Sequence, residues 1–144
     1  LNEKGFWDVA ELSDVPLVAT HSNAFALTPI PRNLTDKQLD AVAESNGVVG
    51  LNFGAMFLRD DGKSDADTPL SVMVAHIDYM VARMGIDHVA FGSDFDGTRV
   101  PAALKDVTGL PKLMAALRDA GYDEAALRKI AHENWVRVLR ETWQ

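Results

Sequence analysis

The sequence predicts an α/β fold in which about three parallel strands are joined by crossover helices and followed by C-terminal helices. Two observations support this prediction. Short apolar runs alternate with longer segments that carry apolar residues at helical spacing, and each apolar run ends in polar residues or glycine. Strands that alternate with helices in this way are usually parallel. Because three parallel strands make a poor free-standing sheet, the pattern indicates the last part of a βα barrel.

Each predicted element has a local signal. Thr35 and Gln38 form a capping-box pattern for one helix, and Thr68-Pro69 supply an N-cap and a first-turn proline for the next. Asp123 is the expected N-cap of the last helix. In chain order, the predicted elements are a helix over 2–12, a strand over 17–20, a loop over 24–33, a helix from 35 to about 46, a strand over 48–53, a loop over 54–67, a helix over 68–85, a strand over 89–92, a helix over 111–120 and a helix from 123 to about 142.

Length and composition narrow the class of protein. The 144 residues suit one domain with enough chain to bury a core. The net charge of -7 argues against nucleic-acid binding, which needs a concentrated basic surface. Apolar runs are too short to predict a membrane-spanning segment. The absence of cysteine excludes disulfides, thiolate metal sites and a cysteine nucleophile.

The strand over 89–92 ends in two carboxylates, Asp94 and Asp96, which lie between Gly92 and Gly97. The carboxyl ends of parallel strands are where α/β folds place their chemistry, and the glycines allow a sharp turn and the close approach of a ligand. Two carboxylates buried there would need a cation or hydrogen-bond donors. The same spacing fits an Asp-Gly turn in which both carboxylates are merely solvated or cap the backbone.

Two more polar residues follow the first predicted strand. His21 ends this strand, and imidazole is a common metal ligand; the alternative is a structural histidine. Arg32 lies in a proline-bounded loop, where its guanidinium could hold a substrate carboxylate through two hydrogen bonds or form a surface salt bridge. A catalytic zinc takes about three protein ligands, so this sequence supplies too few for a complete metal site.

The other polar candidates are expected to be structural. His76 lies beside the apolar stripe of a helix, where packing or hydrogen bonding is its expected role. His88 precedes its strand at the end that serves stability in a barrel. Asn134 lies on the apolar stripe of the last helix and must be hydrogen-bonded, so we expect it to bind backbone groups. We assign no role to His132.

Several segments occur in an order that one known family shares: Thr20-His21-Ser22-Asn23-Ala24, Arg32-Asn33, Gly47-Val48-Val49, Gly92-Ser93-Asp94-Phe95-Asp96-Gly97, and Asn134 followed by Val136-Arg137-Val138. Together they resemble the membrane (renal) dipeptidase family, the M19 metallopeptidases of the amidohydrolase superfamily. The resemblance covers nearly the whole chain. It implies a (β/α)8 TIM-type barrel with two zinc ions, which hydrolyses the peptide bond of dipeptides, and sometimes β-lactam-like amides, through a metal-bridging water.

The resemblance also implies roles for three residues. His21 corresponds to a metal ligand at the end of the sixth strand, and Arg32 to the residue that binds the C-terminal carboxylate of the substrate. Asp94 corresponds to the acid of the eighth strand, which is catalytic or substrate-binding. It would take the proton of the bridging water or engage the free amine of the dipeptide.

The family also has a His-x-Asp pair, a bridging glutamate and a fifth-strand histidine as metal ligands, and we expect none of these in this chain. We therefore expect residues 1–144 to be the C-terminal part of a single barrel domain, whose N-terminal part with strands one to five is absent. The resemblance implies that the full-length protein is a metallodipeptidase. We expect the 144-residue fragment alone to be inactive.

Two other functions stay open at this point. One is a different amidohydrolase-type hydrolase, which Arg32 disfavours because this residue suits a substrate with a free carboxylate. The other is a non-catalytic α/β module that binds an anion or a partner. We expect a soluble protein of the bacterial cytoplasm or periplasm. The sequence leaves open a homodimer, the stereochemical preference for the dipeptide, and the choice among zinc, manganese and cobalt.

Overall fold

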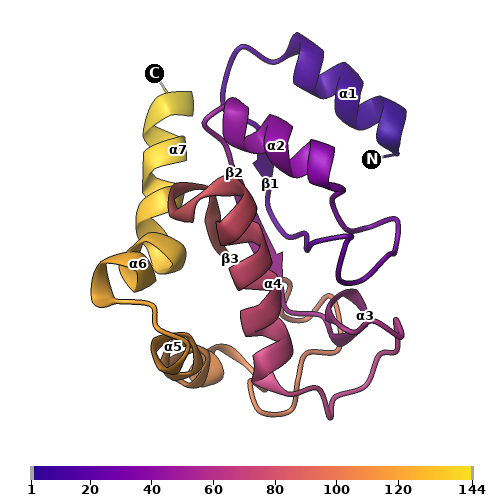
Figure 1. Cartoon of the computed structure of the whole chain (residues 1–144), viewed down its shortest axis with the longest axis vertical. Coiled ribbons are helices and arrows are strands. Elements are labelled where there is room, and N and C mark those ends of the chain that lie inside the picture. The colour runs from indigo at the N-terminus through magenta and orange to yellow at the C-terminus, as the bar shows by residue number, and fades with distance from the viewer. Residues whose placement is uncertain (1, 144) are drawn as a thin grey trace.

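A three-stranded parallel sheet forms the centre of the structure, which is a computed structural model that describes residues 2–143 (Figure 1). Strands β1 (Val18–Ala19), β2 (Val48–Asn52) and β3 (Val89–Ser93) lie side by side in this order, and both pairs are parallel. The predicted neighbouring parallel strands are therefore confirmed. β1 is shorter than the predicted strand over 17–20, because only Val18 and Ala19 pair with β2.

Helices connect and follow the strands. α2 and α4 are the crossover helices, and the segments from α5 onward follow β3. The helices are α1 (Glu3–Leu12), α2 (Asp36–Glu44), α3 (Ala55–Leu58), α4 (Leu70–Met84), α5 (Leu110–Asp119), α6 (Glu124–Arg128) and α7 (Asn134–Thr142), with 3₁₀ turns over Ile86–His88 and Val107–Gly109 and a π-helix over Lys129–Glu133 between α6 and α7.

The predicted caps are mostly present. The Gln38 side chain accepts a hydrogen bond from the Thr35 backbone at 2.9 Å, and Asp123 accepts one from the Ala126 backbone at 2.8 Å. The prediction for α4 was wrong by one residue. Pro69, not Thr68, occupies the N-cap position, and the Thr68 hydroxyl instead donates to the Asp65 carbonyl at 2.6 Å.

Two local features differ from the sequence prediction. α3 lies inside the segment predicted as a long loop, because a single turn is too short to show helical periodicity; its Ala55 and Leu58 are buried in the core. The last predicted helix contains the π-helix, which changes the phase of the helix at Lys129–Glu133. As a consequence, two consecutive residues, Asn134 and Trp135, both donate hydrogen bonds to β3 carbonyls.

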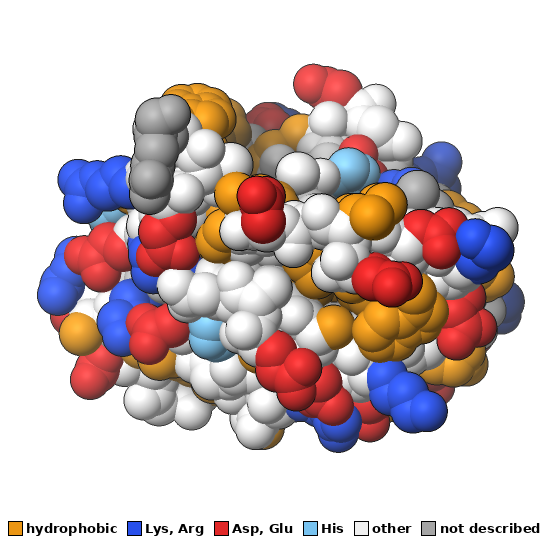
Figure 2. Space-filling model, turned by 90° about the horizontal axis from the view of Figure 1, so that it is seen from above, with side chains coloured by type: hydrophobic (Ala, Val, Ile, Leu, Met, Phe, Trp, Pro, Cys, Tyr) orange, Lys and Arg blue, Asp and Glu red, His pale blue; other side chains and the backbone are white. Residues whose placement is uncertain are grey.

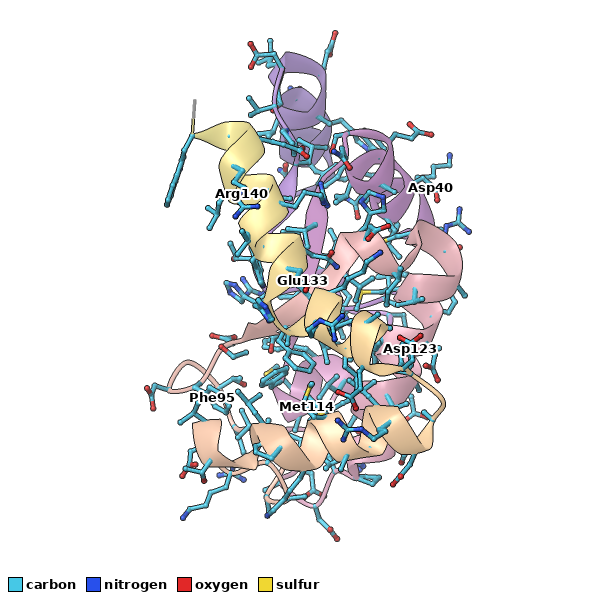
Figure 3. The ribbon with its side chains drawn as sticks, turned by 90° about the vertical axis from the view of Figure 1, so that its left-hand side faces the viewer. Asp40, Phe95, Met114, Asp123, Glu133 and Arg140 are labelled. Atoms are coloured by element: carbon cyan, nitrogen blue, oxygen red, sulfur yellow. The ribbon has the colours of Figure 1, made fainter. Side chains whose placement is uncertain are left out.

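The core lies on both faces of the sheet. Val49 and Leu51 of β2 belong to the main cluster, which includes residues of α2 and α4. Val48 belongs to a second cluster with Ala90 of β3 and Val138 of α7. Seen from the side in Figure 3, α6 and α7 run along the sheet and α5 lies across its end. The sheet is therefore covered on both faces, as parallel strands require.

Charged and apolar side chains are mixed on the surface. Figure 2 shows the end of the molecule near α1, where acidic side chains lie among exposed hydrophobic ones. None of the helices within residues 2–143 combines the length and the apolar character that crossing a membrane would need.

Candidate functional site

The carboxyl ends of the three strands bring the sequence-predicted residues to one edge of the sheet. His21 is the second residue after the end of β1, and Asp94 is the first residue after the end of β3. Because both strand pairs are parallel, these two side chains belong to the same edge. The sequence placed each residue at the carboxyl end of a predicted strand, and the parallel sheet brings these two strand ends to the same side.

The backbone around Asp94 adopts an uncommon conformation. Ser93, Asp94 and Asp96 all have positive φ, at 53°, 73° and 67°. Residues other than glycine rarely adopt this region, and such strain is concentrated at functional sites. The turn closes through a hydrogen bond from the Gly97 backbone to the Asp94 carbonyl at 3.2 Å. The alternative of an Asp-Gly turn is thus present in the structure, and Asp96 is exposed in it as that alternative predicts.

Phe95 anchors this turn to the core. Its ring packs edge-to-face against Phe53, with the ring centroids 5.5 Å apart. Figure 3 shows Phe95 on the loop that leaves β3, at the end of the molecule where α5 carries Met114. The aromatic residue between the two carboxylates therefore holds the turn in place while Asp94 stays half-buried.

Two buried asparagines, to which sequence reasoning gave no role, support Asp94. The Asn52 amide donates a hydrogen bond to Asp94 Oδ2 at 2.9 Å. Asn23 holds the Asn52 backbone from the other side: its Oδ1 accepts from Asn52 N at 2.9 Å, and its Nδ2 donates to Asn52 O at 3.0 Å. The signal in the sequence was an asparagine inside an otherwise apolar buried strand, since such an amide must find partners.

His21 is held through one ring nitrogen. Its Nδ1 lies 2.7 Å from the Thr20 hydroxyl oxygen. The Thr20 backbone, just before His21, passes close to β2 and β3. A side chain at Gly50 or Gly92 would therefore collide with the Thr20 carbonyl oxygen. These two glycines are therefore required where the chain passes close to the sheet just before His21. An imidazole that is bonded through Nδ1 can offer Nε2 to a ligand.

Arg32 lies in the same cleft as His21. Both residues line a cleft of about 280 Å³, together with residues of α1, β1 and the loop before α2. The guanidinium of Arg32 is exposed and lies over the ring of Phe57, 5.5 Å from its centroid. This contact is a cation–π interaction rather than the surface salt bridge considered as an alternative. Asp94 does not line this cleft.

The polar residues expected to be structural are structural. His76 is buried: its Nδ1 accepts from the Ala24 backbone at 3.2 Å and its Nε2 donates to the Leu58 carbonyl at 3.0 Å. Burial lowers the pKa of His76, so the ring is neutral. Asn134 donates to the carbonyls of Ile86 and Val89. His88 Nδ1 lies 2.9 Å from the Gly47 carbonyl at the opposite end of the sheet from His21.

The residues of this chain do not form a complete metal centre. Within residues 2–143, no three His, Cys, Asp or Glu side chains are close enough together to hold a metal ion. His76-Ile77-Asp78 has the His-x-Asp spacing, but it lies on α4 with both ring nitrogens engaged, and Asp78 accepts from the Tyr122 hydroxyl. The described side chains therefore do not supply a full coordination shell for a metal ion.

Comparisons with known proteins match the whole chain. The family model described as membrane dipeptidase (peptidase family M19) matches residues 1–144. An uncharacterized Klebsiella pneumoniae protein encoded in the pqqA 5′ region is 59% identical over all 144 residues, which make up 53% of its length. The dipeptidase ataJ of Aspergillus terreus is 38% identical over 137 residues, covering 93% of this chain and 32% of that protein.

Solved structures share the fold closely. A metallopeptidase of family M19, the dipeptidase AC, is 57% identical with a TM-score of 0.98, over 99% of this chain and 42% of that one. A Rhodobacter sphaeroides metallopeptidase, solved with a phosphinate mimic of the dipeptide L-Ala-D-Ala, gives the same identity and TM-score over 99% of this chain and 41% of that one. The chain thus spans about half the length, or less, of the relatives that it matches.

Proposed function

Because this chain belongs to the membrane dipeptidase family, peptidase family M19, we propose that the full-length protein is a zinc-dependent dipeptidase. The observation that carries this proposal is the placement of His21 and Asp94 at the carboxyl edge of one parallel sheet, with Asp94 held by a buried amide. The substrate is a dipeptide, and the reaction is hydrolysis of its peptide bond.

Three residues of this chain have proposed roles. His21 offers Nε2 to one of two divalent metal ions, while the Thr20 hydroxyl fixes the ring through Nδ1. The metal ions, when bound, would activate the attacking water and polarise the scissile carbonyl. The other ligands of the centre would come from the part of the barrel that lies outside this chain.

Arg32 would bind the C-terminal carboxylate of the dipeptide. Its guanidinium is exposed in the His21 cleft and rests on the Phe57 ring, which limits its motion without using its N–H donors. A planar guanidinium with free donors can bind a carboxylate through two parallel hydrogen bonds. This position in the cleft favours a substrate with a free carboxylate over lactones or phosphotriesters.

Asp94 would move a proton or bind the free amine of the substrate. One of its carboxylate oxygens is occupied by the Asn52 amide, which leaves the other oxygen to act on the substrate. A carboxylate at this position can accept a proton during attack of water and return it to the leaving amine.

The proposal is tested with the zinc-loaded full-length protein, L-Ala-D-Ala, a lactone and a phosphotriester. We expect turnover of the dipeptide, and a loss of kcat of about a hundredfold or more in Asp94→Asn, which is typical of a lost general acid–base. Asp96→Asn is the matched control and should stay within a few-fold of wild type. Asparagine tolerates positive φ at both positions, so each substitution removes the charge with little backbone strain.

Other outcomes would contradict the proposal. Preferred turnover of the lactone or the phosphotriester would indicate a different hydrolase built on the same barrel. No turnover of any of the three substrates would favour a non-catalytic module. Equal losses of kcat in Asp94→Asn and Asp96→Asn would show that Asp94 has no special role.

A further inference from the structure

We propose that Asn52, itself fixed by Asn23, is a positioning residue that sets the orientation of the Asp94 carboxylate. This inference rests on the proposed function, since it assigns a task to Asn52 in the reaction of Asp94. It depends on the hydrogen bonds that Asn23, Asn52 and Asp94 make near the ends of β1, β2 and β3, and on a change of register between β2 and β3.

The first part of the argument is the orientation of the Asn52 amide. Its Oδ1 accepts a hydrogen bond from the Gly54 backbone at 2.7 Å, and its Nδ2 donates to Asp94 Oδ2 at 2.9 Å. The Gly54 N–H can only donate, so the amide oxygen must face it and the NH₂ group must face Asp94. Asn52 is 1% exposed. The donor to the carboxylate is therefore fixed in direction and shielded from water.

The second part is the sheet geometry that brings Asn52 to Asp94. β2 and β3 pair in register up to Leu51 and Phe91, but Asn52 pairs with Ser93, so one residue of β3 is skipped at this point. Such a bulge re-aims side chains near active sites. The shift places Asp94 directly after the partner of Asn52, and the positive φ of Ser93 and Asp94 turns the chain there.

The third part is the role of Asn23. β1 ends at Ala19, so no β1 residue pairs with Asn52 through its backbone in a strand ladder. The Asn23 side chain substitutes for that partner by accepting from Asn52 N and donating to Asn52 O. Its Nδ2 also donates to the Phe57 carbonyl at 3.1 Å, and the side chain is fully buried. Asn23 therefore fixes the end of β2 at the residue that holds Asp94.

These contacts predict an effect of Asn52 on the reaction of Asp94. The Asn52 donor limits rotation of the Asp94 carboxylate, so its loss should lower kcat more than it raises KM. The loss of a hydrogen bond to a charged group corresponds to a decrease of about tenfold or more.

The test is a comparison of kcat and KM for L-Ala-D-Ala, measured with the zinc-loaded full-length protein. In Asn52→Leu, kcat should fall by about tenfold or more while KM changes little. The matched control is Asn134→Leu, because Asn134 is also buried and its amide also makes two hydrogen bonds, both to carbonyls at or before the start of β3. This control should lower the unfolding midpoint and leave kcat and KM close to wild type.

A second variant and a double variant distinguish a positioning role of Asn52 from a purely structural role. Asn52→Asp keeps an acceptor for the Gly54 N–H and replaces the donor by a second carboxylate, which repels Asp94, so kcat should fall at least as far as in Asn52→Leu. In the Asp94→Asn background, Asn52→Leu should cause little additional loss of kcat, since its effect acts through the carboxylate.

The outcomes distinguish the two proposals. Values of kcat in Asn52→Leu and Asn52→Asp that equal the wild-type value would overturn the role of Asn52, while dipeptide turnover by the wild-type protein upholds the proposed function. An equal loss from Asn52→Leu with and without Asp94 would also overturn it. Absence of dipeptidase activity in the wild-type protein would overturn the proposed function, and this inference with it.

Discussion

At the scale of single residues, we propose that Arg32 selects the substrate through its side-chain chemistry. Its charged group is exposed in the cleft that His21 also lines, and the Phe57 ring supports it from one side. An ammonium group could match the charge but not the planar pair of donors. A substitution of Arg32 by lysine can therefore distinguish bidentate recognition of a carboxylate from simple electrostatic attraction of an anion.

Arg32→Lys should weaken the use of dipeptides that have a free C-terminal carboxylate. We expect kcat/KM to fall by about tenfold to a hundredfold, which corresponds to the loss of a charge-assisted hydrogen bond. The same dipeptides with a C-terminal amide serve as the control and should change much less. Equal losses for the two substrate series, measured in the full-length protein, would show that Arg32 does not bind the carboxylate.

His76 makes stability depend on pH. Burial lowers its pKa below the ordinary value of 6.5, so the neutral ring is favoured in the folded state. Its Nδ1 accepts a hydrogen bond from the Ala24 backbone, which a protonated ring could not do. The contribution of His76 is therefore complete above pH 6.5, and it is lost as the pH falls from there towards the lower folded-state pKa.

Replacing His76 should remove this dependence. We expect His76→Leu to lower the free energy of unfolding by about 2 kcal/mol at pH 7.5, because the buried Ala24 N–H loses its partner and the Leu58 carbonyl keeps only the Thr28 hydroxyl. The difference from wild type should shrink as the pH falls to 5.5. Urea unfolding at several pH values measures both effects. A constant difference across this range would mean that His76 does not titrate on unfolding.

At the scale of elements, α7 closes the end of the sheet opposite to the candidate site. The Arg137 guanidinium donates to the carbonyls of Asn46 and Gly47, before β2, and of Asp87, before β3. One side chain therefore binds the starts of two strands. Residues at this end of a barrel serve stability rather than chemistry.

Arg137→Met should destabilise the fold and leave the chemistry unchanged. The variant keeps the apolar stem but removes donors to three carbonyls, with an expected cost of about 2 kcal/mol. Arg140→Met is the matched control, since Arg140 is exposed on the same helix (Figure 3). Chemical denaturation should give a lower unfolding midpoint for Arg137→Met than for Arg140→Met. Similar unfolding midpoints would show that the Arg137 contacts contribute little.

At the scale of the whole molecule, exposed apolar residues are concentrated near the start of the described chain. Leu12 is 84% exposed, and Val18 on the outer strand β1 is 44% exposed; the others in this segment are Trp7, Val9 and Val15. Surface of this kind and an open strand edge invite pairing. We propose that the rest of the barrel domain packs here and supplies the strands that precede β1.

A polypeptide of these 144 residues alone should bind zinc weakly and hydrolyse no dipeptide. His21 is one imidazole, well short of the roughly three protein ligands of a catalytic zinc. We also expect poor solubility that improves when the rest of the barrel is supplied as a separate chain. Calorimetric titration with zinc and a dipeptidase assay check this. Tight stoichiometric binding with turnover would place the metal site elsewhere in the chain.

The sequence by itself determined the order of the elements and the strand ends that bear the candidate site residues. Periodicity identified the strands and the longer helices because each buries a continuous apolar face. Polar residues directly after the apolar runs marked His21 and Asp94, since parallel strands share one carboxyl edge. The structural roles of His76 and Asn134 also followed from their positions on apolar helix faces.

Only the tertiary structure decided which groups hold Asp94. The contacts from Asn23 to Asn52 and from Asn52 to Asp94 join residues 29 and 42 positions apart, and they depend on a bulge that no local pattern encodes. The single turn of α3 and the π-helix before α7 are likewise fixed by packing, because segments of four or five residues carry too little periodicity to be predicted. Local sequence placed the reactive groups at the strand ends, and long-range hydrogen bonds set their orientation.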